Sequence, residues 1–417
     1  MPSWFIFCVA YADFGSACNT GHMITKKGRR LKLAYFTLEG LGSFATAFYF
    51  YYLYFFMRHQ FGFTSKDNLA FAALTGLVYV FFSWQAGRFA QRCGYFNALK
   101  LGFSVMIFAL AVGSLLHTVA AIVMDTVLLS IGMCFLWPTI EALVSEGEDV
   151  IGLPRMVGTY NVVWAGTNAL ALFGGGTLVE KFGFKTLFLL PLVIFIAELV
   201  AVLWLEKHAN AVACATASQP IVKLPPDSHR PSPAKTKAFL RMAWLANPFA
   251  YIAINTFIPM LPTLAAHFHL SPMSAGFACS LWCFVRLGTF IVLWHWTDWH
   301  YRFRWLVLAF ATLIISFAAI LIVPHLAVLL LAQIFFGAAI GLIYYSSLFY
   351  SMDASEAKGE HGGIHEAAIG VGNFIGPALG AASLQFLPQY ANSGAIAVSG
   401  LLMLGFGALL TIWKTAR

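Results

Sequence analysis

Long apolar stretches alternate with short polar segments along most of the chain. Between the polar breaks lie windows of about 20 mostly apolar residues, the length that a helix needs to cross a bilayer. Twelve windows follow one another: 33–57, 69–87, 98–117, 119–143, 157–179, 185–205, 239–266, 273–294, 305–323, 326–350, 363–385 and 391–413. Because only His117-Thr118 separates the third apolar stretch from the fourth, and only Pro324-His325 separates the ninth from the tenth, we expect tight hairpins there. The pattern predicts an all-α membrane protein with twelve transmembrane helices.

A polar stretch in the middle of the chain interrupts this pattern. It contains a proline-rich run over residues 225–233, which is typical of a flexible linker. We therefore expect an N-terminal cytoplasmic arm over 1–32, a six-helix bundle over 33–205, a linker over 206–238, a second six-helix bundle over 239–413 and a tail over 414–417. Met23 begins a basic stretch and is an alternative start within the arm.

The two halves share weak internal similarity. Gly132 in the fourth window matches Gly341 in the tenth, and residues 166–176 match residues 370–380 at nearly the same offset. The polar loops after the second and eighth windows fit a similar offset. A repeated offset favours a duplicated unit, so we expect two pseudo-symmetric six-helix bundles.

Composition places this chain in lipid rather than in water. Hydrophobic residues make up 60% of the chain and charged residues 10%, whereas a soluble domain has roughly 45–50% and 25%. The net charge of +8 does not indicate nucleic-acid binding, because there is no soluble domain or long basic stripe to carry it.

The basic residues predict the orientation of the chain. If both termini are cytoplasmic, 20 of the 25 Lys and Arg residues fall in cytoplasmic segments, four fall outside, and Arg286 lies within a window. Basic residues gather in cytoplasmic loops. We therefore expect a multi-pass protein of the bacterial inner (plasma) membrane, in contact with membrane lipid, with both termini in the cytoplasm.

The loop after the second window carries a partial motif. Its residues Gly87, Arg92 and Gly94 match a known pattern of glycine and basic positions, while Gln91 stands where an acid is usual. In the second half, Asp298 keeps the acid without the glycines. With two six-helix halves and a central linker, residues 33–413 resemble the major facilitator superfamily. The resemblance implies a secondary transporter, with the gating loops at Gly87, Arg92, Gly94 and Asp298.

Ionisable residues inside the windows are the main candidates for function, because a charge in the membrane is costly. Arg286 is the leading candidate. We expect it to bind substrate or form a functional ion pair, with a structural ion pair or a side chain extended to the membrane interface as the alternative. The acidic candidates are Glu198, Glu39, Asp125 and Glu366, and His365 beside Glu366 could exchange protons. Packing or solvation at a loop edge is the alternative for each.

Polar amides and aromatic residues add further candidates. Asn161, Asn168, Asn255 and Asn373 could hydrogen-bond a solute in a central cavity, or they bridge helices. The aromatic run over residues 49–56 is predicted to form a belt at the membrane interface, with stacking on a ligand as the alternative.

These observations predict a monomeric transporter that moves a small organic solute by alternating access and is coupled to protons. A multidrug efflux antiporter is the alternative within this class, and a membrane sensor or a membrane-embedded enzyme is the alternative outside it. The sequence contains no GxxxxGK[ST] loop for nucleotides and no grouping for catalysis. The seven cysteines have no zinc spacing, so we expect neither a cofactor nor a metal.

Overall fold

The computed structural model describes residues 26–116, 118–146, 148, 152–216, 232–354 and 358–416. Within these ranges the chain forms helices and connecting turns. The helices are α2 (Lys26–Phe61), α3 (Ser65–Cys93), α4 (Tyr95–Leu115), α5 (Val119–Ser145), α6 (Gly152–Phe182), α7 (Thr186–Thr216), α8 (Pro233–His267), α9 (Pro272–Cys279), α10 (Leu281–His295), α11 (Phe303–Ile322), α12 (Leu326–Ala354), α13 (Lys358–Phe386) and α14 (Ser393–Ala416). The tight hairpin expected at Pro324-His325 is confirmed between α11 and α12.

The all-α membrane fold is confirmed. Eleven segments among the described residues are long and apolar enough to cross a membrane, and α9 and α10 together form one of them. The remaining predicted span is α2, which is 36 residues long. Tyrosines and Glu39 lower the hydropathy of α2 below that of the other spans. Its neighbours, rather than lipid, accommodate these polar groups.

The helices form two bundles with the same internal pairing. In the first, α4 packs on α5 and α7, while α2 packs on α6 and α7. In the second, α11 packs on α12 and α14, while α8 packs on α13 and α14. Each helix of one bundle thus has a counterpart six spans later. This repeated pairing is the two-bundle arrangement predicted from the internal similarity.

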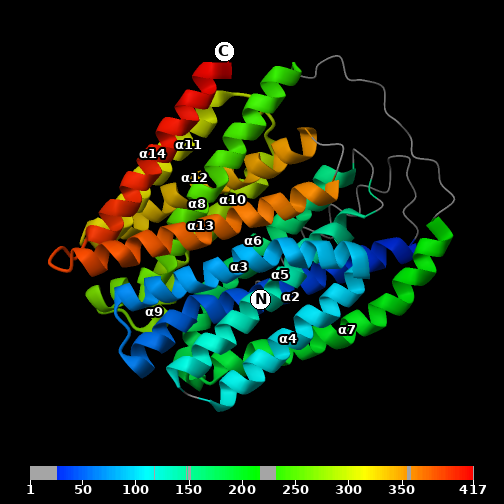
Figure 1. The fold of residues 1–417 in the computed structure, drawn as a ribbon, viewed down its shortest axis with the longest axis horizontal. Coiled ribbons are helices and arrows are strands. Elements are labelled where there is room, and N and C mark those ends of the chain that lie inside the picture. The colour runs from blue at the N-terminus through cyan, green and yellow to red at the C-terminus, as the bar shows by residue number, and fades with distance from the viewer. Residues whose placement is uncertain are drawn as a thin grey trace.

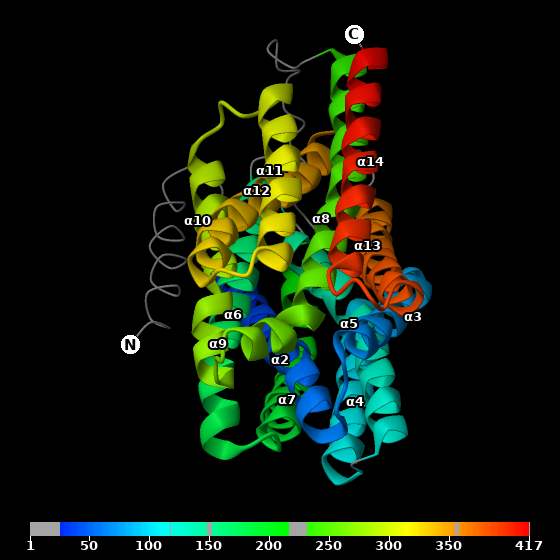
Figure 2. The ribbon, with the colours of Figure 1, turned by 90° about the vertical axis from the view of Figure 1, so that its left-hand side faces the viewer.

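The two bundles meet along α3 and α13, and along α6 with α9 and α10. Figure 1 shows α3 and α13 side by side, with α4 and α7 on the far side of one bundle and α11 and α14 on the far side of the other. Figure 2 shows the same neighbours, with α9 beside α6. These contacts allow the bundles to enclose a space between them.

Glycines let the backbones approach at these seams. A Cβ on Gly76 of α3 would collide with the backbone of Asn373 and Phe374 in α13. A Cβ on Gly176 of α6 would collide with the Pro272 carbonyl at the start of α9. Small residues permit such close packing in membranes, where no hydrophobic force acts between helices.

The aromatic run of α2 is buried, so the prediction of an interfacial belt over residues 49–56 is wrong. Tyr49, Tyr52 and Leu53 are fully enclosed. The reason is the position of α2, which contacts α5, α6, α7 and α8 and has little surface left for lipid. The aromatic side chains therefore pack between helices or face the space between the bundles.

Helices continue past several expected boundaries. The α7 helix extends to Thr216 and α8 begins at Pro233, so part of the expected linker is helical. Residues 217–231 and 1–25, the latter including Met23, lie outside the described residues. At the start of α2, the Lys32 ammonium donates to the Glu146 carbonyl over 2.6 Å and pairs with Glu148 at 3.3 Å. A lysine on the last carbonyls of a helix stabilises its C-terminus, here that of α5.

Gly176→Val tests the close approach of the bundles. We expect overpacking against Pro272 to lower the free energy of unfolding by about 1–3 kcal/mol. Thermal unfolding of the purified protein in detergent measures this loss. Gly174→Val in the same helix is the control, because a Cβ on Gly174 meets nothing within 4 Å. Equal stability of the two variants would contradict the packing described here.

Candidate functional site

A cavity of about 200 Å³ lies between the bundles. Four helices of each bundle line it: α2, α3, α5 and α6 from the first, and α8, α10, α12 and α13 from the second. Its walls are mainly aromatic and include Tyr51, Tyr54, Tyr79, Tyr160, Tyr251, Tyr344, Trp137, Trp164 and Trp282. Its charged lining residues are Arg286 and Glu366. A mostly apolar cavity with a few polar groups is typical of a small-molecule site.

Arg286 lies in the second turn of α10, directly after the break at Ser280 that separates α9 from α10. Its side chain is only 3% exposed. The guanidinium carbon lies 4.4 Å from the centre of the Trp164 ring and 5.0 Å from that of Trp282. Since Trp164 belongs to the first bundle and Trp282 to the second, Arg286 connects the two across the cavity.

Glu366 forms a second connection between the bundles. The Tyr79 hydroxyl of α3 donates a hydrogen bond to the Glu366 carboxyl of α13. Glu141 of α5 interacts electrostatically with the same carboxyl. The side chain of His365 lies outside those that the structure describes, so its predicted role in proton exchange remains a prediction.

Three of the four predicted asparagines line the cavity. Asn255 of α8 donates to Asn373 of α13 over 2.6 Å, and the Asn168 side chain accepts from the Tyr51 hydroxyl at 3.4 Å. Asn161 is elsewhere: it is fully buried, and neither of its amide atoms has a hydrogen-bond partner among the described residues. The cavity therefore has several amide groups that a solute could contact.

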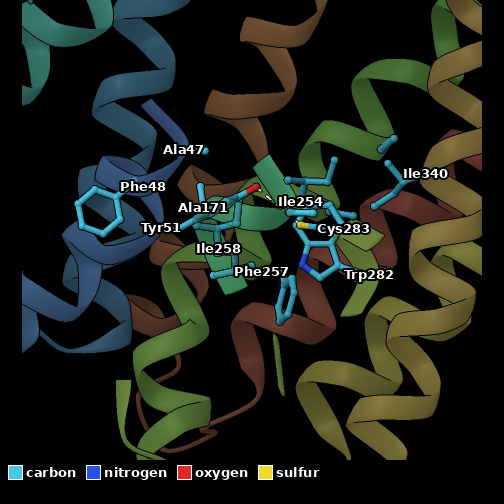
Figure 3. Packing of buried hydrophobic residues seen from close by; sticks show 14 of the residues in the cluster. Ala47, Phe48, Tyr51, Ala171, Ile254, Phe257, Ile258, Trp282, Cys283 and Ile340 are labelled. Atoms are coloured by element: carbon cyan, nitrogen blue, oxygen red, sulfur yellow. Dashed lines mark hydrogen bonds between the residues drawn. The ribbon is translucent and has the colours of Figure 1, made fainter. Parts of the chain in front are cut away.

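Tyr51 also reaches toward the second bundle. Its hydroxyl lies 3.9 Å from the Cys283 thiol of α10. Figure 3 shows Tyr51 gathered with Ile254, Ile258, Trp282 and Cys283 between the helices. Cys279 and Cys283 are both buried.

Glu39 and Glu198 lie next to each other inside the first bundle, outside the cavity lining. Both are almost fully buried, at 0% and 1% exposure. The Ser43 hydroxyl donates to one Glu39 oxygen over 2.9 Å. The other Glu39 oxygen and both Glu198 oxygens have no hydrogen-bond partner in the described part of the chain. The two carboxyl groups interact electrostatically, and no ion pair with a described basic residue relieves them.

Asp125 lies apart from both the cavity and the Glu39–Glu198 pair, in the second turn of α5. Its carboxyl accepts a hydrogen bond from the Tyr49 hydroxyl of α2. A close approach at Gly113 of α4 encloses it further. Asp125 does not line the cavity, so this contact ties α2 to α5 within the first bundle.

The predicted gating residues lie at helix ends, away from the cavity. Gly87 and Arg92 are in the last turns of α3, and Gly94 joins α3 to α4 with a φ of 93°, which favours glycine. Asp298 is exposed and pairs with Arg302 at 3.8 Å. The predicted gating residues therefore belong to two separate connections: Gly87, Arg92 and Gly94 lie where α3 meets α4, and Asp298 lies between α10 and α11.

The bundles are held together at the end opposite the α7–α8 connection. There the Thr263 hydroxyl of α8 accepts from Arg58 at 3.0 Å and lies 2.7 Å from the Ser65 hydroxyl. Lys66 donates to Gln385 over 2.9 Å. These contacts close one end of the space between the bundles.

Sequence reasoning raised a ligand-facing role only for the aromatic run of α2, as an alternative, and it missed the aromatic lining from the other helices. Its signal lies in the spacing, because residues four apart share one face of a helix. Trp282 precedes Arg286 by four residues, and Trp164 precedes Asn168 by the same interval. A tryptophan one turn before a polar residue within a span would have indicated the lined face.

A comparison with protein families gives one match. The model of the family described as Major Facilitator Superfamily matches residues 35–377 and 243–417. Among curated protein sequences, none matches the chain.

Several solved structures share the fold. The human organic anion transporter MFSD10 (TETRAN) is 14% identical, with a TM-score of 0.63 over 92% of this chain and 100% of that one. A POT family transporter in complex with a thioalcohol-conjugated peptide is 13% identical, with a TM-score of 0.70 over 93% and 97%. An inward-facing bacterial homolog of the human lysosomal transporter Spinster is 13% identical, with a TM-score of 0.64 over 94% and 96%.

Tyr49→Phe tests the tie between α2 and α5. Removing the hydroxyl leaves the buried Asp125 carboxyl without its tyrosine donor, so we expect a loss of about 1–3 kcal/mol in the free energy of unfolding. Denaturant titration of the purified protein measures this. Tyr54→Phe is the control, since its hydroxyl makes no hydrogen bond within the described ranges. A loss as large in the control would show that the aromatic ring environment, not Asp125, is responsible.

Proposed function

Since this chain belongs to the major facilitator superfamily, and is therefore a multi-pass membrane transporter rather than an enzyme, we propose that it moves a small organic solute across the membrane by alternating access. In this mechanism the two bundles rock about a central site, which opens first to one side and then to the other. We propose that one chain is the functional unit, because both bundles that line the cavity belong to it.

The observation that carries this proposal is the shared lining of the cavity. Arg286 contacts Trp164 across the bundles, and Glu366 contacts Tyr79 in the same way. A solute bound among these groups would touch both bundles at once. Its binding would therefore depend on how the bundles are placed, which is the requirement for coupling binding to a conformational change.

The contacts at one end of the cavity support the same mechanism. The bonds of Thr263 with Arg58 and Ser65 are few, polar and near the rim. They could break and reform as the bundles rock. By the distribution of basic residues, the opposite end, where α7 and α8 are connected, faces the cytoplasm.

The buried carboxyl groups support proton coupling. Glu39 and Glu198 lie side by side without a basic partner among the described residues. Two carboxylates close together in an apolar interior repel each other, which disfavours charging both at once. We therefore propose that this pair carries a proton that takes part in transport. Glu366 in the cavity would be the group that senses the solute, with Glu141 interacting electrostatically with both Glu39 and Glu366.

Uptake into proteoliposomes tests the proposal. Purified protein is reconstituted, and sugars, organic acids, nucleosides and cationic dyes are compared with protein-free vesicles. We expect saturable flux of one class. If no solute in any class enters faster than into protein-free vesicles, the transport proposal is contradicted.

Glu366→Gln tests the coupling. The glutamine keeps a group that can accept from Tyr79 but cannot exchange a proton, so we expect uptake that no longer responds to an imposed pH gradient while exchange of solute continues. Uptake with and without the gradient measures this difference. Glu206→Gln is the control, because Glu206 pairs with Lys100 at the half-exposed end of α7. If uptake by the Glu366→Gln variant still responds to the pH gradient, Glu366 is not the coupling site.

A further inference from the structure

The charge of Arg286 is incompletely satisfied within the protein. Its Nε and Nη2 atoms are buried, and neither has a hydrogen-bond partner among the described residues. The faces of Trp164 and Trp282 attract the cation. An attraction of this kind recovers only part of the free energy that is lost when an ion is removed from water. The rings alone therefore do not offset the burial of this guanidinium.

Glu366, the acidic residue that lines the cavity, does not neutralise Arg286. Glu366 is engaged by Tyr79, and the ion pairs found among the described residues do not include Arg286. Tyr251 and Tyr344 lie within electrostatic reach of both Arg286 and Glu366. The Tyr344 ring stacks on Trp164 with 5.3 Å between ring centres. Aromatic groups thus surround a cation that still has two donors available.

Building on the transport proposed above, we infer that Arg286 binds the carboxylate of the solute and that the solute is a small organic monocarboxylate with a flat apolar body. The Nε and Nη2 atoms lie on one edge of the planar guanidinium. A carboxylate matches this edge with two parallel hydrogen bonds. The body of the solute then packs against Tyr51 and Tyr251, which line the cavity near Arg286.

The charged lining residues and the volume of the cavity limit further which solutes it can hold. Arg286 is the one basic residue that lines the cavity, and Glu366 is already present. A dianion such as a phosphate ester would bring a second negative charge without a second cation. The cavity volume of about 200 Å³ is below the roughly 300–1,000 Å³ of typical ligand pockets, so the solute is a small acid with one flat ring.

Binding to the purified full-length protein tests this inference on matched pairs of acid and amide. The probes are benzoate with benzamide, phenylacetate with phenylacetamide, and hexanoate with hexanamide, together with phenyl phosphate and benzylamine, measured by calorimetry at neutral pH. We expect at least one aromatic acid to bind about 10- to 100-fold more tightly than its amide, since a hydrogen bond to a charged group is lost in the amide. Phenyl phosphate should bind more weakly than that acid.

Variants assign the binding to Arg286. Arg286→Lys keeps the charge but loses the planar pair of donors, so the preference for acid over amide should fall about 10-fold or more. Arg304→Gln is the control, because Arg304 is exposed at the start of α11 and does not line the cavity. Thermal unfolding in detergent shows that each variant is folded.

Three results would overturn the inference: no acid of the panel binds, an amide or benzylamine binds as well as the matched acid, or Arg286→Lys keeps the full preference. The wild-type comparison of acid with amide decides the question even if a variant fails to fold. Transport of a neutral or cationic solute in the vesicle screen would overturn the inference and leave alternating access standing. An acid that binds at Arg286 without crossing the membrane would instead contradict the transport proposal alone.

Discussion

The cost of a charge in an apolar surrounding governs the arrangement of this protein. Lipid offers no hydrogen bonds, so backbone groups are satisfied within helices and polar side chains must turn inward. Arg286, Glu366 and three asparagines all face the cavity between the bundles, the place where a solute and water can reach them. Other inward polar groups, among them Glu39, Glu198 and Asp125, are instead enclosed within the first bundle.

The same constraint explains why the bundles are paired as they are. Without a hydrophobic force between helices, close approach depends on small residues, and Gly76 and Gly176 supply it at the two seams. Cross-bundle contacts at the cavity are made by side chains, Arg286 with Trp164 and Glu366 with Tyr79. Close backbone packing at the seams and side-chain contacts at the cavity together form the interface between the bundles.

Much of this fold could be predicted from the sequence, because apolar length reports directly on the membrane. Arg286 could also be singled out, since it lies deep within a window whereas Lys100, Lys185 and Arg241 lie at window edges. Contacts between distant segments could not be predicted. Nothing in the sequence places Glu39 beside Glu198, or separates Asn161, which is buried away from the cavity, from Asn168, which lines it.

The errors have physical causes as well. The aromatic run of α2 has no helical period, so it could not show that α2 is surrounded on all sides. The break at Ser280 follows Pro272 by too many residues to be read from a proline signal, yet it sets the position of Arg286. Trp164 and Trp282 resembled ordinary apolar residues because only their spacing of four from Asn168 and Arg286 marks them in the sequence.

The most direct test of alternating access is the accessibility of the cavity from each side of the membrane. Thr75 lines the cavity from α3, and Thr75→Cys can be placed in a background in which the seven native cysteines are replaced. A membrane-impermeant thiol reagent is then applied to vesicles of either orientation. Modification from both sides, slowed in each case by a transported solute, is the result that the mechanism predicts. Modification from one side alone, whether or not solute is present, would contradict it.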